Sequence, residues 1–331
     1  MTLEQDSSTS LSETRILHDA DADAVRALFK EIFHHDMSAE FWRWKYRARD
    51  GCAVGVFKNG ELVAHYGGVG AAILLKGKSE RALQVVDVMV KVTERKAVRT
   101  QSPFFLASSM FLENFIGYDK PYLLGYGFPS NRAMGIAERL GIYAPVGRMF
   151  EISWKLDASV ARIGFWHKCV QITLANFANY QKKIDDLWQQ FSQTMRDYIV
   201  VQKDAAFIEH RYLRNPKNAY TILLMTSRIT GKPLGLVVLK VEPERALLMD
   251  FIGSFQNYPA VLQLAKWQTT ELGRQQLATW CSEVFVERLV DESATSTTLP
   301  ITTPANIWTS GPPPEELQNR WWLTPGDTDF L

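Results

Sequence analysis

The sequence lacks several features that would identify a function directly. It has three cysteines in 331 residues, and its best apolar stretch, Leu234 to Val241, ends at Glu242-Pro243, far short of the roughly 18 residues that cross a bilayer. It contains no Gly-x-Ser-x-Gly, no His-Glu-x-x-His and no P-loop. These absences argue against a membrane partner and against the commonest hydrolase, metallopeptidase and nucleotide-binding classes.

Charge and cysteine usage narrow the classes further. The 37 basic and 36 acidic residues give a net charge of +1, far from the basic balance that sequence-independent phosphate binding needs, so we expect no nucleic acid as the main ligand. A small anionic cofactor requires only a local cluster. Cys52, Cys169 and Cys281 are odd in number and widely separated, which fits a reducing, cytoplasmic location. Residues 1–12 are polar and acidic, and we expect a disordered tail rather than a secretory signal.

Two stretches in different halves of the chain read alike. Residues 41–46 are Phe-Trp-Arg-Trp-Lys-Tyr, and residues 207–212 are Phe-Ile-Glu-His-Arg-Tyr. Each is followed by a polar turn, an apolar strand, a Gly-marked turn and a second strand, and then by a third strand with one acid, Asp87 or Asp250, among apolar residues. Chance could match one hexad but not the order of the further elements, so the sequence predicts a duplicated α/β domain.

The segment between the copies has a pattern of its own. From residue 160 to 191 the apolar residues fall mostly three or four apart, and no proline occurs between Pro145 and Pro216. This spacing predicts a long amphipathic helix, a helical connector over residues 158–205 that packs on both domains. Its wide apolar stripe, with Trp166, Trp188 and Phe191, leaves the seam of a homodimer open as the alternative.

The first copy carries the stronger chemical signal. A polar loop follows the strand that ends at Val90, and Pro103 then opens an apolar helix. The loop has four basic residues, Lys91, Arg95, Lys96 and Arg99. This order places backbone N–H groups and the positive end of the helix dipole beside cationic side chains, which predicts a site for phosphate. A further strand at 121–125 and a helix from about 130 to Gly141 follow.

These elements resemble the GNAT superfamily of N-acetyltransferases. Its pattern is a strand, an Arg or Gln-x-x-Gly-x-Gly or Ala loop that holds the pyrophosphate of acetyl-CoA, a helix, a strand, and a final helix closing with Leu-Gly-Phe. Here residues 86–90 resemble the fourth strand, Arg95 takes the place of the first loop residue, and Ala133 with residues 138–142, Glu-Arg-Leu-Gly-Ile, resembles the closing helix. The resemblance covers residues 15 to about 155 and, through the repeat, residues 207–331 more weakly.

The resemblance implies an α/β (α+β) fold of two tandem GNAT-like domains, each a mixed twisted sheet flanked by helices. We expect the first domain at residues 13–157, with the acyl-CoA site, and a degenerate second domain at residues 206–331, because the eight residues between Asp250 and Pro259 include no Lys or Arg. The implied co-substrate is acetyl-CoA or another acyl-CoA, with no metal, and the acceptor is a small-molecule amine, an amino sugar or an amino acid. The implied cofactor-binding residues are Met89, Val90, Arg95, Lys96, Ala97, Val98, Arg99, Thr100 and Asn131.

The sequence departs from the family pattern at two places. The two small positions of the loop hold Val98 and Thr100, and a β-branched residue resists the positive φ and the close backbone approach that Gly allows. Either side chains of the loop replace some backbone contacts, or this copy no longer binds CoA tightly. The family's general-acid tyrosine lies four residues before the Gly of Leu-Gly-Phe, and that place holds Ala137. Tyr118, Tyr126 or Tyr143 could supply the proton instead, and the sequence does not rank them.

Candidate residues for the amine side also follow. An acid in a buried strand must be paired, hydrogen-bonded or shifted in protonation, so Asp87 is either a general base, as the resemblance implies, or a structural acid, as its match with Asp250 suggests. His65 lies on a strand whose alternate residues would line the cleft. Trp44 and Tyr46 could stack on a substrate or pack in the core.

The leading function is therefore transfer of an acyl group from acyl-CoA to a primary amine, by direct attack within a ternary complex. Strand N–H groups near Met89 and Val90 would steady the thioester oxygen. Two other classes stay open. One is a GNAT-fold binding protein without catalysis, which the missing glycines and the missing tyrosine favour. The other is aminoacyl transfer from a charged tRNA, which the neutral charge balance disfavours.

Overall fold

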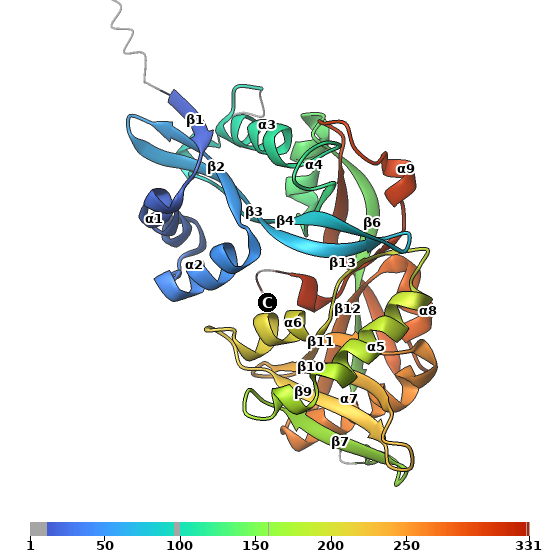
Figure 1. Cartoon of the computed structure of the whole chain (residues 1–331). Coiled ribbons are helices and arrows are strands. Elements are labelled where there is room, and N and C mark those ends of the chain that lie inside the picture. Colours follow the sequence, from blue (N-terminus) through green and yellow to red (C-terminus); the bar gives the residue numbers. More distant parts are fainter. Residues whose placement is uncertain (1–11, 96–99, 158, 329, 331) are drawn as a thin grey trace, which may run out of the picture.

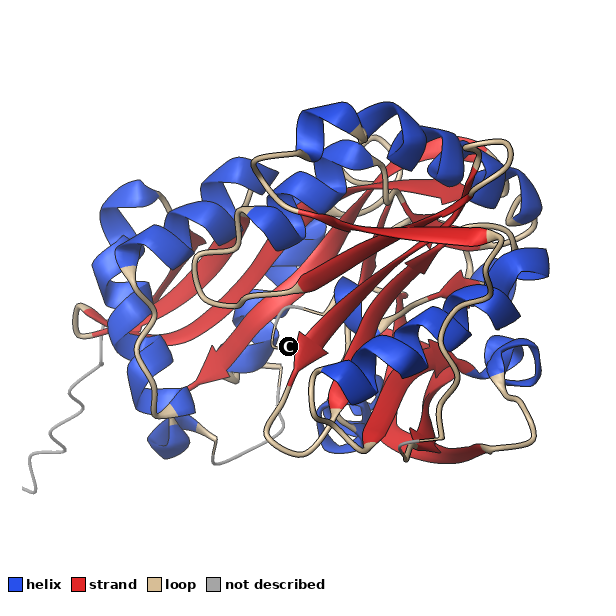
Figure 2. Ribbon diagram, turned by 90° about the horizontal axis from the view of Figure 1, so that it is seen from below, coloured by secondary structure: helices blue, strands red, loops and turns tan. Residues whose placement is uncertain are grey.

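The computed structural model describes residues 12–95, 100–157, 159–328 and 330. Within these residues the chain forms two seven-stranded mixed sheets, with helices on both sides of the strands (Figures 1 and 2). The helices are α1 (Ala22–Phe33), α2 (Ala39–Tyr46), α3 (Pro103–Phe115), α4 (Asn131–Arg139), α5 (Gln181–Thr194), α6 (Ala205–Ile208), α7 (Tyr258–Glu271), α8 (Val286–Leu289) and α9 (Pro314–Leu317). A π-helical turn, Glu209–Leu213, continues α6.

The first sheet has the strand order β1-β2-β3-β4-β5, with β8 paired to β3 and β14 paired to β8. The second sheet has the order β13-β6-β12-β11-β10-β9-β7. The strands of the first sheet are β1 (Ser12–Ile16), β2 (Cys52–Lys58), β3 (Glu61–Leu75), β4 (Lys78–Val90), β5 (Leu124–Tyr126), β8 (Ile199–Val201) and β14 (Trp321–Trp322). Those of the second are β6 (Tyr143–Lys155), β7 (His167–Ile172), β9 (Thr221–Ser227), β10 (Pro233–Val241), β11 (Ala246–Ile252), β12 (Gln276–Ser282) and β13 (Ala294–Asn306).

The duplication expected from the sequence is visible in the order of elements. The series α2-β2-β3-β4-α3-β5-α4-β6 in the first half matches α6-β9-β10-β11-α7-β12-α8-β13 in the second. The two acids occupy matching places, because Asp87 lies on β4 and Asp250 on β11. The predicted fold of two tandem α/β domains is thereby confirmed.

The two halves exchange strands, so each sheet contains segments from both. Strand β6, which follows α4 in the first half, lies between β12 and β13 of the second sheet. In return, β8 extends the first sheet beside residues 73–75 of β3, and β14 pairs with β8. The aromatic run at residues 321–323 predicts a strand that completes the sheet of the second domain, and this prediction is wrong, because β14 lies in the first sheet. The domain limits at residues 13–157 and 206–331 remain predictions.

The long helical connector is also corrected. Among the described residues 159–205, only α5 is a helix of more than one turn, and residues 167–172 form β7, which pairs along its whole length with β9. Pairing with β9 satisfies the backbone hydrogen bonds of this segment. A short apolar run is compatible with either a helix or a strand, and here the tertiary contact favours the strand. Trp188 and Phe191 are buried within the chain, with Trp322 against Phe191, and so are not available for the homodimer seam that the sequence left open as the alternative, whereas Trp166 is exposed.

Helices cover the first sheet on opposite faces, with α1 and α2 on one face and α3 and α4 on the other (Figure 1). Met89 packs in a cluster with buried residues of α1 such as Leu28, whereas Tyr66 and Leu83 pack with Phe111 of α3. The helices begin where the sequence provides caps. Ser102 Oγ accepts from the Phe105 N–H ahead of Pro103, and Ser130 Oγ accepts from the Ala133 N–H. Both helix starts agree with the sequence-based prediction.

Candidate functional site

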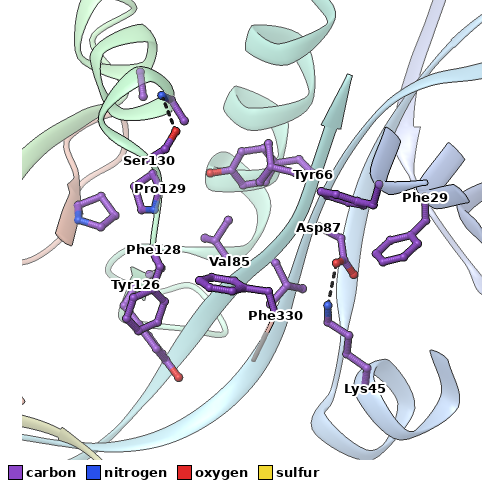
Figure 3. A pocket seen from close by; sticks show the side chains of 18 of the residues that line it. Phe29, Lys45, Tyr66, Val85, Asp87, Tyr126, Phe128, Pro129, Ser130 and Phe330 are labelled. Carbon is purple, nitrogen blue, oxygen red and sulfur yellow. Dashed lines mark hydrogen bonds and ion pairs between the residues drawn. The ribbon is translucent and has the colours of Figure 1, made fainter. Parts of the chain in front are cut away.

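A cavity of about 450 Å³ opens where two parallel strands of the first sheet separate. Strands β4 and β5 pair only as far as Gln84 and Tyr126. Beyond this point β4 continues to Val90, whereas the segment that follows β5 turns toward α4. Residues on both sides of the gap line the cavity, as Figure 3 shows for Val85, Asp87, Phe128 and Ser130. Residues of helices from both faces of the sheet contribute to its walls, so the gap passes through the sheet.

The lining is mostly apolar with a few polar groups. The apolar residues are Phe29, Phe33, Phe41, Val85, Val86, Val88, Phe104, Phe128, Pro129, Ala133, Ala137, Pro304 and Phe330, with the glycines Gly125 and Gly127. The polar residues are His35, Lys45, Tyr66, Asp87, Tyr126, Ser130, Tyr143 and Lys217. An apolar cleft with few convergent polar groups is the usual form of a small-molecule site.

Asp87 is the only carboxylate among the described lining residues, and a backbone bulge places it there. The register of β3 and β4 runs from Gly67 opposite Val86 to His65 opposite Met89, so Asp87 and Val88 of β4 together lie opposite one residue of β3. Asp87 has a φ of 47°, in the left-handed region that Asp tolerates better than most residues. A bulge of this kind turns a side chain out of the regular alternation.

Both oxygens of the Asp87 carboxylate have partners from α2. Oδ1 accepts from the Lys45 ammonium at 2.7 Å, and Oδ2 accepts from the Tyr46 hydroxyl at 2.6 Å. Burial alone would raise the pKa of Asp87, but the charge of Lys45 and the hydrogen bonds from Lys45 and Tyr46 overcome it and lower the pKa below the ordinary value. Asp87 is therefore ionised at neutral pH and held in one orientation.

The second half repeats this arrangement without the cavity. The Tyr212 hydroxyl, at the same place in its hexad as Tyr46, donates to Asp250, and the buried Lys203 ammonium forms an ion pair with Asp250. The turn at Gly326 fills the space beside this acid, because a Cβ there would lie far inside contact distance of the Asp250 carboxylate and the Tyr212 hydroxyl. The acid and its tyrosine therefore belong to the duplicated fold, and among the described residues it is Asp87 that also borders a cavity.

Three tyrosines line the cavity. Tyr143, on β6, forms a hydrogen bond with Tyr66, on β3, and burial raises the pKa of Tyr143 to about 12. Burial likewise raises the pKa of Tyr66 and of Tyr126. Ala137 lines the same cavity as Tyr143, so a tyrosine from the next strand approaches the region where the family pattern has a tyrosine on the helix. All three hydroxyls are protonated at neutral pH and can donate a hydrogen bond.

Three other sequence-based candidates lie elsewhere. His65 points to the opposite face from Tyr66, because side chains alternate along β3. It is buried, where its Nδ1 lies 2.7 Å from the Asp87 carbonyl oxygen, and burial lowers its pKa. Trp44 stacks on His210 and donates from Nε1 to the His210 carbonyl oxygen at 2.9 Å, which joins the two halves. The Tyr46 hydroxyl donates its hydrogen bond to Asp87. None of these three residues lines the cavity.

The expected phosphate loop lies partly outside the described residues, since these omit Lys96, Ala97, Val98 and Arg99. Thr100 and Arg95 are exposed, and the Arg95 Nε donates to the Val90 carbonyl oxygen at 2.8 Å. The Lys91 ammonium already forms two ion pairs, with a carboxylate oxygen of Glu61 at 2.5 Å and one of Glu31 at 3.0 Å.

The remaining cofactor candidates do not line the cavity. Asn131, at the start of α4, is exposed, and its side-chain oxygen accepts from Thr302 at 3.3 Å. Met89 and Val90 do not line the cavity, and Met89 is buried beside α1. Among the candidates for catalysis, Asp87, Tyr126 and Tyr143 are thus brought together.

The sequence did not identify Lys45, Tyr66, Phe29 or Phe330 as site residues. Lys45 is flanked by Trp44 and Tyr46 in the repeated hexad, and a lysine between two aromatic residues was a usable signal for a buried partner. Phe330 comes from the opposite end of the sequence, and its ring packs edge-on to Phe128 at 6.4 Å. No local pattern connects such distant residues.

Two kinds of site are not found in the described part of the chain. Residues 12–95, 100–157, 159–328 and 330 contain no group of three or more His, Cys, Asp or Glu side chains arranged to hold a metal ion. The helices in these ranges include none with the length and apolar character needed to cross a membrane.

Comparison with known proteins identifies the first half. Residues 13–145 match the family model of the acetyltransferase (GNAT) domain. This match covers β1 to the start of β6 and therefore includes Asp87, the loop at residues 95–100 and both separated strands. The resemblance to the GNAT superfamily is confirmed over this part of the chain. No curated protein matches the chain in sequence.

Solved structures extend the likeness to almost the whole chain. A probable N-acyltransferase of unknown function from Enterococcus faecalis V583 is 11% identical with a TM-score of 0.71 over 94% of this chain and 74% of its own. A GCN5-related N-acetyltransferase from Kribbella flavida is 15% identical with a TM-score of 0.62 over 88% of this chain and 71% of its own.

A tandem GNAT protein from the clavulanic acid biosynthesis pathway is 14% identical with a TM-score of 0.58, and the match covers 92% of this chain and all of the other. At these identities the likeness establishes the fold. The chain therefore has the fold of a tandem GNAT protein.

Proposed function

We propose that this chain is an acyltransferase that moves an acyl group from acyl-CoA to a primary amine, with the active site in the first domain. The observation that carries the proposal is the cavity at the separation of β4 and β5, inside the region that matches the GNAT family model. Strands that diverge expose backbone N–H and C=O groups, which an extended amide-containing arm such as that of CoA can bond as an added strand would.

The proposed roles follow from the positions of the polar residues. The amine nitrogen attacks the thioester carbonyl carbon, the C–S bond breaks, and the products are an amide and the free thiol of CoA. Asp87 accepts the proton that the amine loses, and Tyr143, protonated at neutral pH, donates a proton to the departing sulfur. Tyr126 is the alternative acid. Val88, the other bulge residue of β4, takes the role first assigned to Met89 and Val90 and offers its N–H to the thioester oxygen.

The cofactor's phosphates are assigned to the loop that precedes α3. Arg95 and Thr100 lie on the described edges of this loop, and Asn131 begins the neighbouring helix α4. Because Lys91 already pairs with two glutamates, the positive charge for phosphate must come from the other basic residues of the loop. This assignment predicts an affinity for CoA that falls as salt screens exposed charges.

The test is binding of acetyl-CoA by calorimetry, together with release of free thiol in the presence of a panel of primary amines. Ala133→Trp places a large ring in the cavity wall, and Arg132→Trp, on the exposed side of the same helix, is its matched control. We expect Ala133→Trp to abolish binding and transfer and Arg132→Trp to retain both. Equal acetyl-CoA binding by the two variants would place the cofactor elsewhere and refute the proposal.

A second function is favoured by one observation. Both oxygens of Asp87 are engaged, and the second half repeats the arrangement, as expected for a structural acid in a GNAT-fold binding protein without catalysis. This alternative predicts that acetyl-CoA or another ligand binds with the same sensitivity to Ala133→Trp while no amine releases thiol above the uncatalysed rate.

A further inference from the structure

The cavity has two chemically different ends, on the two faces of the first sheet. At one end lie α3 and α4, with Phe104, Ala133 and the Tyr66–Tyr143 pair. Figure 3 shows Pro129 and Ser130 on this side and Phe29 and Lys45 on the opposite side, beyond Asp87. If acyl-CoA enters beside α3 and α4, as the proposed function requires, the amine must arrive from the end formed by α1 and α2.

The wall at the α1 and α2 end is aromatic. Phe29 and Phe33 lie with ring centroids 4.7 Å apart, His35 meets Phe29 edge-on at 5.0 Å, and Phe41 continues the wall from α2. Phe33 is 41% exposed although it is a large apolar residue. An exposed ring beside a cavity can bury apolar area against a bound molecule, and aromatic pairs add specific edge or stacked contacts.

The charge at this end is positive. The one carboxylate among the described lining residues is Asp87, and Lys45 and Tyr46 occupy it. Lys217, which the second half contributes, is exposed, stands 5.6 Å from the centroid of the Phe41 ring and forms no ion pair with any described residue. A polyamine or an aminoglycoside would bring several positive charges to a wall that offers no free carboxylate. An anionic group would instead find an unneutralised ammonium.

We infer that the acceptor is an amine carried on an apolar, ring-bearing molecule with an anionic group, as in an aromatic amino acid. Its ring packs on Phe29, Phe33 and Phe41, its anionic group meets Lys217, and its amine is directed to Asp87. The inference rests on the proposed function for the direction of entry, but the binding preference itself concerns these residues alone. It also explains why a residue of the second half lines a site in the first.

The test uses calorimetry with N-acetyl-L-phenylalanine, a product of the inferred class, and its neutral counterpart N-acetyl-2-phenylethylamine, which need no CoA. We expect Lys217→Ala to weaken binding of the anionic ligand about 5- to 10-fold, as for an exposed charge-assisted contact, and to leave the neutral ligand unchanged. Lys232→Ala, at an exposed lysine of the same half outside the cavity, is the control and should change neither. Equal affinity of the wild-type protein for the two ligands would overturn the inference that the acceptor carries an anionic group.

A second pair of variants tests the aromatic wall. Phe33→Ala should weaken binding of both ligands, whereas Phe165→Ala, at an exposed ring outside the cavity lining, should not. If Phe33→Ala weakens decanoyl-CoA binding and leaves N-acetyl-L-phenylalanine unchanged, the wall holds an acyl chain and the inference is wrong.

Turnover separates this inference from the proposed function. Faster acylation of spermidine than of phenylalanine and 2-phenylethylamine would refute the inference while supporting acyl transfer. Lys217-dependent binding of the anionic ligand, with no thiol released from acetyl-CoA by any amine, would support the inference while refuting the transferase.

Discussion

Replacing Asp87 by asparagine should change both stability and turnover, and the structure allows the two effects to be separated. The substitution keeps the shape of the side chain but leaves the buried Lys45 ammonium without the carboxylate that now lies 2.7 Å away. Removal of one partner of a buried ion pair costs about 3–5 kcal/mol. At a few degrees per kcal/mol for a chain of this size, the Tm should fall by on the order of 5–10 °C.

The second half provides a matched control for this experiment. Asp250→Asn removes the carboxylate that pairs with Lys203 and accepts from Tyr212. The space beside Asp250 is filled by the turn at Gly326, whereas Asp87 lies beside the cavity. Both variants should therefore lose stability, measured by thermal unfolding. Asp87→Asn alone should lower acyl transfer per folded molecule, by about 10² to 10⁴-fold for a lost general base. Equal transfer by the two variants, corrected for the folded fraction, would show that Asp87 is structural.

The pH dependence of stability follows from the same contacts. Because the folded pKa of Asp87 lies below its unfolded value of about 3.9, the ionised acid stabilises the fold above that pH, and the contribution is lost as the pH falls through the folded pKa. Asp87→Asn should therefore lose less stability than the wild type on acidification below about pH 4. Parallel acid unfolding curves would contradict the assignment of the ion pair.

The other predictions concern the acid, the filled second site and the phosphate loop. Tyr143→Phe should lower kcat with little change in acetyl-CoA affinity, and an unchanged kcat would move the role of the acid to Tyr126. Because the pKa of Tyr143 is about 12, the wild-type rate should not fall between pH 8 and 10 through loss of this proton. Gly326→Ala should lower the Tm sharply, since its Cβ would collide with Asp250, and an unchanged Tm would mean that the turn is not seated there. Arg95→Ala should weaken CoA by about 1.5–3 kcal/mol in calorimetry at low salt, and equal affinity would remove Arg95 from the phosphate site.

Local signals in the sequence predicted the repeated elements well. The hexads, the Gly-marked turns and the helix starts at Pro103 and Ser130 depend on short-range patterns, and each is present in the structure. The acid on the third strand was also predictable as a site that must be paired, because an ionised group in an apolar strand has few alternatives. Its partners were not, since Lys45 reaches Asp87 across 42 positions of the chain.

The errors have a common physical cause. His65 and Tyr66 are neighbours, and a one-residue difference in facing decides which of them lines the cavity. The bulge at Asp87 and Val88 changes the facing of side chains along β4, and nothing in the apolar run marks it. Residues 167–172 fit a helix by spacing but form a strand because β9 offers an edge. Such choices depend on partners that lie far away in the sequence.

The exchange of strands between the halves has a consequence for how the chain reaches its native state. The first sheet gains β8 and β14 only after residues 199–201 and 321–322 exist, and β6 finds its neighbours β12 and β13 more than a hundred residues later. A nascent first half therefore leaves the ribosome with unsatisfied strand edges and must wait for the second. Pairings of such long range make folding slow. The duplicated halves are thus equivalent in pattern, yet each sheet is completed by strands from the other half.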